Sequence, residues 1–88
     1  MKTYFVTGGC GFIGSNFVHH LFENKLANRV INLDKMTYAG NHENLASIEN
    51  DNKYKFIKGD ICDQRTIQDI LEKYSPDVIV HFAAESHV

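Results

Sequence analysis

The pattern of apolar and polar residues along the chain predicts short strands that alternate with amphipathic helices. A strand is indicated where apolar residues run together or alternate over roughly four to eight positions, and a helix where they recur every three or four positions. The predicted elements, in chain order, are a strand at Lys2–Val6, a helix from Phe12 to about Lys25, a strand at Arg29–Leu33, a strand at Lys53–Lys58, a helix capped by Asp63 that reaches Tyr74, and a strand at Val78–Ala84.

This order of elements predicts an α/β fold. The last strand is apolar without interruption, which is typical of a strand that is buried on both faces of a parallel sheet. We expect the first half of a doubly wound parallel sheet, a Rossmann fold, with strand order 3-2-1-4. The 88 residues are enough for about one small domain, and we expect them to be the N-terminal part of a larger one.

A glycine-rich segment, Thr7–Gly14, lies between the first strand and the first helix. A strand, a glycine turn and a helix in this order are typical of a dinucleotide phosphate site, where glycines allow the turn, the approach of the pyrophosphate and the close packing of the helix. Two spacings fit the sequence: Gly9, Gly11 and Gly14, or Gly8, Gly11 and Gly14. The sequence alone does not decide which glycine makes the first turn.

Asp34 ends the second predicted strand, about 20 residues beyond the last glycine, where a Rossmann unit places the acid that binds the adenosine ribose. A carboxylate there would repel a 2′-phosphate by roughly 4 kcal/mol at about 4 Å and an effective dielectric near 20. Asp34 therefore favours NAD over NADP, although the neighbouring cation of Lys35 weakens this preference.

Composition removes several classes of partner. The net charge of -2 provides no basic excess, so neither nucleic acid nor an anionic membrane is an expected partner. Cys10 and Cys62 have no disulfide or metal-ligand spacing, and we interpret them as reduced thiols of a cytoplasmic protein. Glu85 and His87 are only two candidate ligands, so no metal site is expected.

Tyr54 and Lys58 have the spacing of a catalytic tyrosine–lysine pair, but that pair works on a helix, where such positions are roughly 6 Å apart. On a strand the same spacing is about 13 Å. We therefore predict that both are ordinary strand residues and that the chain holds no catalytic residue.

The segment Thr7–Gly14 resembles the extended short-chain dehydrogenase/reductase family. Within that family, Leu33–Asn41 and Phe82–Val88 are similar to segments of the dTDP-glucose 4,6-dehydratases. The resemblance covers the whole chain, with Cys10 and Met36 as minor departures. It implies NAD-dependent oxidation of glucose at C4, elimination of water across C5 and C6, and reduction at C6, in a cytoplasmic homodimer that acts on dTDP-glucose.

The motif and the resemblance together assign candidate binding residues at the end of each predicted strand. Candidate cofactor contacts are Gly8, Gly11, Phe12, Ile13, Gly14, Asp34, Lys35, Met36, Thr37, Asp60, Ile61, Phe82, Ala83, Ala84, Glu85 and Ser86. Ser86 also matches a sugar-nucleotide contact of the family, and it follows a strand end beside the switch point of the sheet.

The resemblance also implies that the family's catalytic residues and sugar-nucleotide domain lie beyond Val88, so the 88 residues alone should be inactive. Two alternatives remain open. One is another extended short-chain dehydrogenase/reductase, such as a sugar-nucleotide epimerase, against which Tyr38–Asn41 argues. The other is a non-catalytic NAD(P)-sensing protein on the same fold.

Overall fold

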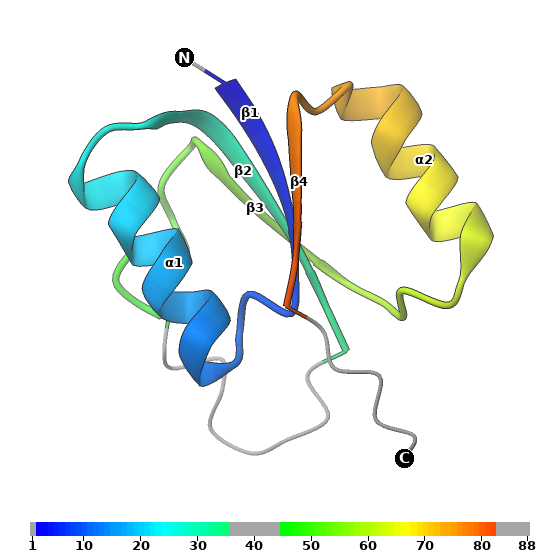
Figure 1. Ribbon diagram of the computed structural model, residues 1–88, viewed down its shortest axis with the longest axis horizontal. Coiled ribbons are helices and arrows are strands. Elements are labelled where there is room, and N and C mark those ends of the chain that lie inside the picture. The colour runs from blue at the N-terminus through cyan, green and yellow to red at the C-terminus, as the bar shows by residue number, and fades with distance from the viewer. Residues whose placement is uncertain (1, 36–44, 83–88) are drawn as a thin grey trace.

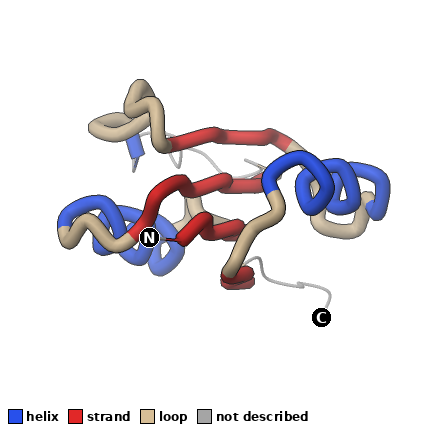
Figure 2. The backbone as a smooth tube through the Cα atoms, turned by 90° about the horizontal axis from the view of Figure 1, so that it is seen from above, coloured by secondary structure: helices blue, strands red, loops and turns tan. Residues whose placement is uncertain are grey.

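The structure, a computed structural model, describes residues 2–35 and 45–82. Its elements in chain order are β1 (Lys2–Thr7), α1 (Phe12–Glu23), β2 (Ala27–Asp34), β3 (Tyr54–Lys58), α2 (Gln64–Tyr74) and β4 (Val78–His81). The strands form one sheet in the order β3-β2-β1-β4, and α1 and α2 flank it on opposite sides (Figures 1 and 2). The predicted α/β class and strand order 3-2-1-4 are confirmed.

All three strand pairings are parallel, so the strands end at the same edge of the sheet. Phe5 at the centre of β1 pairs with Ile31 of β2 on one side and with Ile79 of β4 on the other. The segments that follow Thr7, Asp34, Lys58 and His81 therefore all begin at this carboxyl edge.

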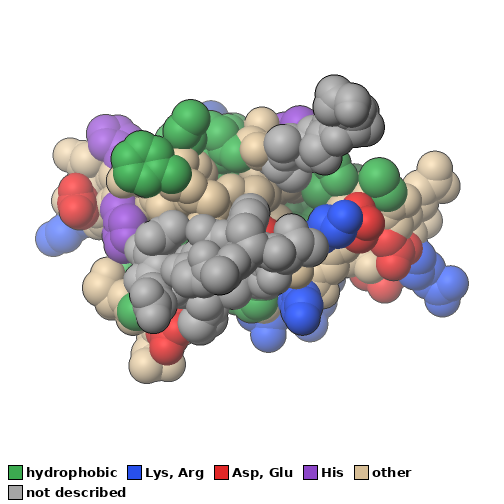
Figure 3. All heavy atoms as spheres, turned by 90° about the horizontal axis from the view of Figure 1, so that it is seen from below, with side chains coloured by type: hydrophobic (Ala, Val, Ile, Leu, Met, Phe, Trp, Pro, Cys, Tyr) green, Lys and Arg blue, Asp and Glu red, His purple; other side chains and the backbone are tan. Residues whose placement is uncertain are grey.

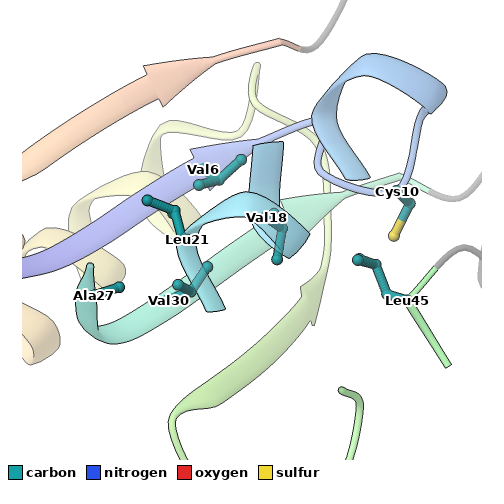
Figure 4. Close-up of a cluster of buried hydrophobic side chains, with 7 residues drawn as sticks. All are labelled: Val6, Cys10, Val18, Leu21, Ala27, Val30 and Leu45. Atoms are coloured by element: carbon teal, nitrogen blue, oxygen red, sulfur yellow. The ribbon is translucent and has the colours of Figure 1, made fainter. Parts of the chain in front are cut away.

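The core is divided by the sheet into two clusters, because successive residues of a strand point to opposite faces. Val30 lies in the α1-side cluster and Ile31 in the α2-side cluster, and both are fully buried. Figure 4 shows the α1-side cluster, which consists of Val6, Cys10, Val18, Leu21, Ala27, Val30 and Leu45. The α2-side cluster is built on Phe5, Ile31, Leu33 and Ile70.

The two helices begin differently. The side chain of Asp63 caps α2 and accepts hydrogen bonds from the N–H groups of Arg65 and Thr66, as the sequence predicts. At the other end, Ser75 takes a left-handed conformation with φ 45°. No side chain caps α1, whose N-cap residue is Gly11.

The burial predicted for both faces of β4 stays a prediction. β4 pairs only with β1 among the described strands and so forms an edge, and Ile79 is 58% exposed. An unbroken apolar run indicates burial only when neighbouring elements cover both faces of the strand. Ala83 and Ala84, expected in the same strand, lie outside the described residues.

Within the described ranges, neither helix has the length and apolar character needed to span a bilayer.

Candidate functional site

The chain leaves β1 through a turn made by Gly8, whose φ is 76°. This left-handed conformation suits glycine, because other residues carry a Cβ that is strained there. The Gly8 N–H donates to the carbonyl of Leu33 at 2.9 Å, and the Gly8 carbonyl accepts from the Gly11 N–H at 3.3 Å. The structure thus selects the spacing Gly8, Gly11 and Gly14.

Two other glycines are needed for steric reasons. A Cβ on Gly14 would collide with the carbonyl oxygen of Gly8 and would lie 2.9 Å from the Cα of Gly9. The start of α1 therefore packs directly against the turn, as the sequence predicts for the third glycine of the motif. A Cβ on Gly9 would collide with the side-chain amide of Asn32, so this glycine is required by packing against β2.

Asn32, which the sequence analysis did not identify, fixes the turn from β2. It is fully buried, and its Oδ1 accepts a hydrogen bond from the Gly9 N–H at 2.9 Å. Its amide nitrogen donates to the Tyr54 hydroxyl at 3.0 Å and contacts the Cys10 sulfur at 3.4 Å. A signal was available: an amide stands inside an apolar strand two residues before Asp34, and hence on the same face of the sheet.

Asp34 is 5% exposed at the end of β2, beside the glycine turn. Its Oδ2 accepts a hydrogen bond from the Cys10 N–H at 2.9 Å. Burial, and then the negative charge of Asp34, raise the pKa of the Cys10 thiol to about 11. Cys10 is therefore a neutral, buried thiol whose backbone joins the turn to the carboxylate.

The N-terminus of α1 opens at the same edge of the sheet. The first turn of a helix leaves N–H groups without intrahelical partners and carries roughly half a positive charge. Here that turn contains no acidic residue. Phe12 and Ile13 on this turn are large apolar side chains that are 78% and 67% exposed. Figure 3 views the molecule from this side and shows exposed hydrophobic side chains beside charged ones.

The segments after β2 and β3 are joined at this edge by a pair of charges. Lys35 Nζ lies 3.3 Å from Asp60 Oδ2, and the Cys62 N–H donates to Asp60 Oδ1 at 2.9 Å. The bond from Cys62, together with the Lys35 ammonium, lowers the pKa of Asp60. Ile61, the other candidate here, is half-buried and packs against the α2-side core cluster.

The end of β4 returns to the end of β1. The Phe82 N–H donates to the Thr7 carbonyl at 2.8 Å, and Thr7 Oγ1 is 2.6 Å from His81 Nδ1. The Phe82 ring packs on Phe17 of α1 with 5.5 Å between centroids. The structure thus brings Phe82 to the same edge as the glycine turn. The remaining candidates lie outside the described residues: Met36, Thr37, Ala83, Ala84, Glu85 and Ser86.

Tyr54 and Lys58 both lie on β3, so the prediction that they are strand residues is confirmed. The Tyr54 hydroxyl accepts from Asn32, and burial raises its pKa to about 12 even though this hydrogen bond lowers it. In residues 2–35 and 45–82 no group of three or more His, Cys, Asp or Glu side chains is arranged to hold a metal ion.

The parallel sheet, the turn at Gly8, the uncapped start of α1 and the carboxylate at the end of β2 together define the class: a Rossmann-type α/β unit with a glycine turn of the phosphate-binding kind. The family model described as GDP-mannose 4,6 dehydratase matches residues 5–88. The chain belongs to this family.

Similar proteins support this assignment. The chain is 52% identical, over 83 residues, to the dTDP-glucose 4,6-dehydratase of Salmonella typhimurium, with 94% of this chain and 23% of the relative covered. The dTDP-glucose 4,6-dehydratase of Bacillus anthracis, solved in complex with NAD, superposes with a TM-score of 0.90 at 41% identity, covering 98% of this chain and 28% of that one. The dTDP-glucose 4,6-dehydratase of Streptomyces venezuelae, also solved with NAD, gives a TM-score of 0.86 at 48% identity. This match covers 98% of this chain and 27% of that one.

These matches confirm the resemblance to dTDP-glucose 4,6-dehydratases that the sequence segments indicated. The chain spans about a quarter of the length of the relatives that it matches.

Proposed function

We propose that this chain is the N-terminal part of the NAD-binding domain of a dTDP-glucose 4,6-dehydratase. The whole protein would convert dTDP-glucose to dTDP-4-keto-6-deoxyglucose. Relatives and solved structures of that activity match nearly the whole chain, and two of those structures contain NAD.

One observation carries the proposal: the 2.9 Å hydrogen bond from the Cys10 N–H to Asp34 Oδ2. It joins the glycine turn after β1 to the acid after β2, so a phosphate site and a ribose site would lie side by side. A dinucleotide requires this arrangement, since its pyrophosphate and its adenosine ribose are neighbouring groups.

The residues present fit the phosphate end of NAD. The close contact between Gly14 and the turn holds the start of α1 against Gly8 and Gly9. The N–H groups of the first turn of α1 would then face the pyrophosphate, with no side-chain cap or acidic residue to compete for them. Phe12 and Ile13 would lose their exposure to water by covering the bound cofactor. When bound, NAD supplies the hydride acceptor and donor for the oxidation at C4 and the reduction at C6.

Asp34 would accept hydrogen bonds from the ribose hydroxyls, and it gives the preference for NAD over NADP. Asp60 and Ile61 after β3, and Phe82–Ser86 after β4, are the further proposed contacts. We place Ser86 at the sugar nucleotide as well. Hydride transfer and elimination need positioned acids and bases, and we propose that residues outside this chain provide them. We further propose that the whole protein is a cytoplasmic homodimer, as the family resemblance implies.

The test is to incubate the full-length protein with dTDP-glucose and NAD and to identify the product by NMR. We expect dTDP-4-keto-6-deoxyglucose. A C4-epimerised sugar nucleotide would instead identify a sugar-nucleotide epimerase. NAD binding without any turnover of sugar nucleotides would support a sensing protein.

A further inference from the structure

We propose that Asp60 is a specificity-determining residue that helps the protein to reject NADP, because it keeps the cation of Lys35 engaged. This inference rests on the proposed function, and it concerns a contact that neither the glycine motif nor Asp34 accounts for. It also answers a question that the sequence leaves open, namely why a lysine directly after Asp34 would not attract a 2′-phosphate.

The geometry places this ion pair next to the proposed ribose site. Lys35 follows Asp34 directly, and its Nζ lies 3.3 Å from Asp60 Oδ2. The Gly59 N–H donates to the Asp34 carbonyl at 3.1 Å, so the backbone segments that carry the two charges are themselves joined. The bond from the Cys62 N–H to Asp60 Oδ1 holds the carboxylate in place.

A 2′-phosphate brings up to two negative charges to the ribose and needs a cation to offset the charge of Asp34. With Lys35 paired to Asp60, an incoming phosphate meets two carboxylates and an ammonium group that is already partly neutralised. The side chains of Lys35 and Asp60 are 56% and 43% exposed. The pair is therefore of the weak, salt-screened kind, and its effect on selectivity should be graded rather than absolute.

Lys58 is the rival cation. It is the register partner of Asp34 across the β2–β3 pairing, and it is exposed. If a 2′-phosphate could recruit Lys58, the state of Lys35 would matter little. Lys58 therefore provides a matched control on the same edge of the sheet.

The experiment measures dissociation constants of NAD and NADP for the full-length protein by titration calorimetry at low ionic strength. The variants are Asp60→Asn, Asp60→Asn with Lys35→Gln, and Asp60→Asn with Lys58→Gln. The asparagine retains an oxygen that can accept from the Cys62 N–H, and a thermal melt checks that each variant is folded. We expect Asp60→Asn to shift the NADP-to-NAD affinity ratio about twofold to fivefold toward NADP, and we expect high salt to reduce the shift.

The added Lys35→Gln change should remove most of this shift, and the added Lys58→Gln change should leave most of it. An unchanged ratio in Asp60→Asn would overturn the proposal, and so would a shift of undiminished size without Lys35. If the wild-type protein binds neither dinucleotide, the proposed function fails and this inference fails with it. If the wild-type protein binds NAD but the NADP-to-NAD affinity ratio is the same in Asp60→Asn, only the role proposed for Asp60 is contradicted.

Discussion

Asn32 of β2 holds Gly9 of the glycine turn through a buried hydrogen bond of 2.9 Å from the Gly9 N–H to Asn32 Oδ1. The same amide group packs where a Cβ of residue 9 would lie, so the two residues fit each other sterically as well as by hydrogen bonding. The position of the turn is therefore set from the neighbouring strand and not by the turn residues alone.

This relationship predicts that Asn32→Ala destabilises the protein by about 1–3 kcal/mol, since the buried Gly9 N–H and the Tyr54 hydroxyl both lose their partner. Urea unfolding of the full-length protein would measure the loss. The matched control is Asn24→Ala, which removes only exposed contacts to His20 on α1. Equal unfolding free energies for Asn32→Ala and the wild type would show that the turn does not depend on Asn32.

A second prediction concerns the packing of α1 on the turn. Alanine is the better helix former, but Gly14→Ala would press a methyl group into the backbone of Gly8 and Gly9. We expect Gly14→Ala to lower the free energy of unfolding by about 1–3 kcal/mol, as at other overpacked sites, and to weaken NAD binding.

Gly59→Ala is the matched control for that substitution. Its methyl group would meet the side-chain ends of Leu33 at 3.1 Å and Thr66 at 3.5 Å, which can move more easily than backbone. Comparable losses of stability for the two variants, measured in the same unfolding experiment, would contradict the steric role given to Gly14.

The third prediction is a fall in stability at alkaline pH. Burial raises the pKa of Cys10 from 9.0 to about 11 and the pKa of Tyr54 from 10.0 to about 12. Between the lower and the higher pKa of each group, the unfolded chain releases a proton that the folded chain retains. The free energy of unfolding therefore decreases as the pH rises through this range. The contribution of these two neutral groups to the free energy of unfolding is fully present below about pH 9 and is lost progressively above it.

Thermal melts between pH 8 and pH 11 would test this prediction, with Cys10→Ala and Cys62→Ala as the paired variants. We expect Cys10→Ala to flatten the early part of the decline, from about pH 9. Cys62 is exposed, so Cys62→Ala should leave the decline that is due to Cys10 in place. A profile for Cys10→Ala that declines as steeply as that of Cys62→Ala would be the contrary result.

Much of the fold could be predicted because it depends on local patterns. The helical spacing of apolar residues located α1 and α2, Asp63 marked the start of α2, and strand-to-strand crossovers restricted the sheet to few topologies. The burial of β4 could not be predicted in the same way. Exposure at Ile79 depends on which elements cover the strand, and an apolar run does not contain that information.

The site was predictable at the level of residue types and less so at the level of contacts. Gly8 and Gly9 cannot be distinguished by residue type. The structure shows that Gly8 adopts a φ of 76°, whereas a side chain at position 9 would collide with Asn32. Asn32 was missed because a single amide in a strand has no motif of its own. Its role follows from the pairing of β1 with β2, a tertiary relationship.

The most direct test of NAD binding at the glycine turn is titration of NAD into the full-length protein and its Asp34→Ala variant. The control is Asp69→Ala, which replaces an exposed side chain on α2. Loss of hydrogen bonds to a charged group predicts binding weaker by about 1.5–3 kcal/mol for Asp34→Ala, and no change for the control. Asp34→Asn can still accept from the Cys10 N–H, so it separates support of the turn from the effect of charge. Unchanged NAD affinity in a folded Asp34→Ala protein would contradict the assignment of Asp34 to the ribose.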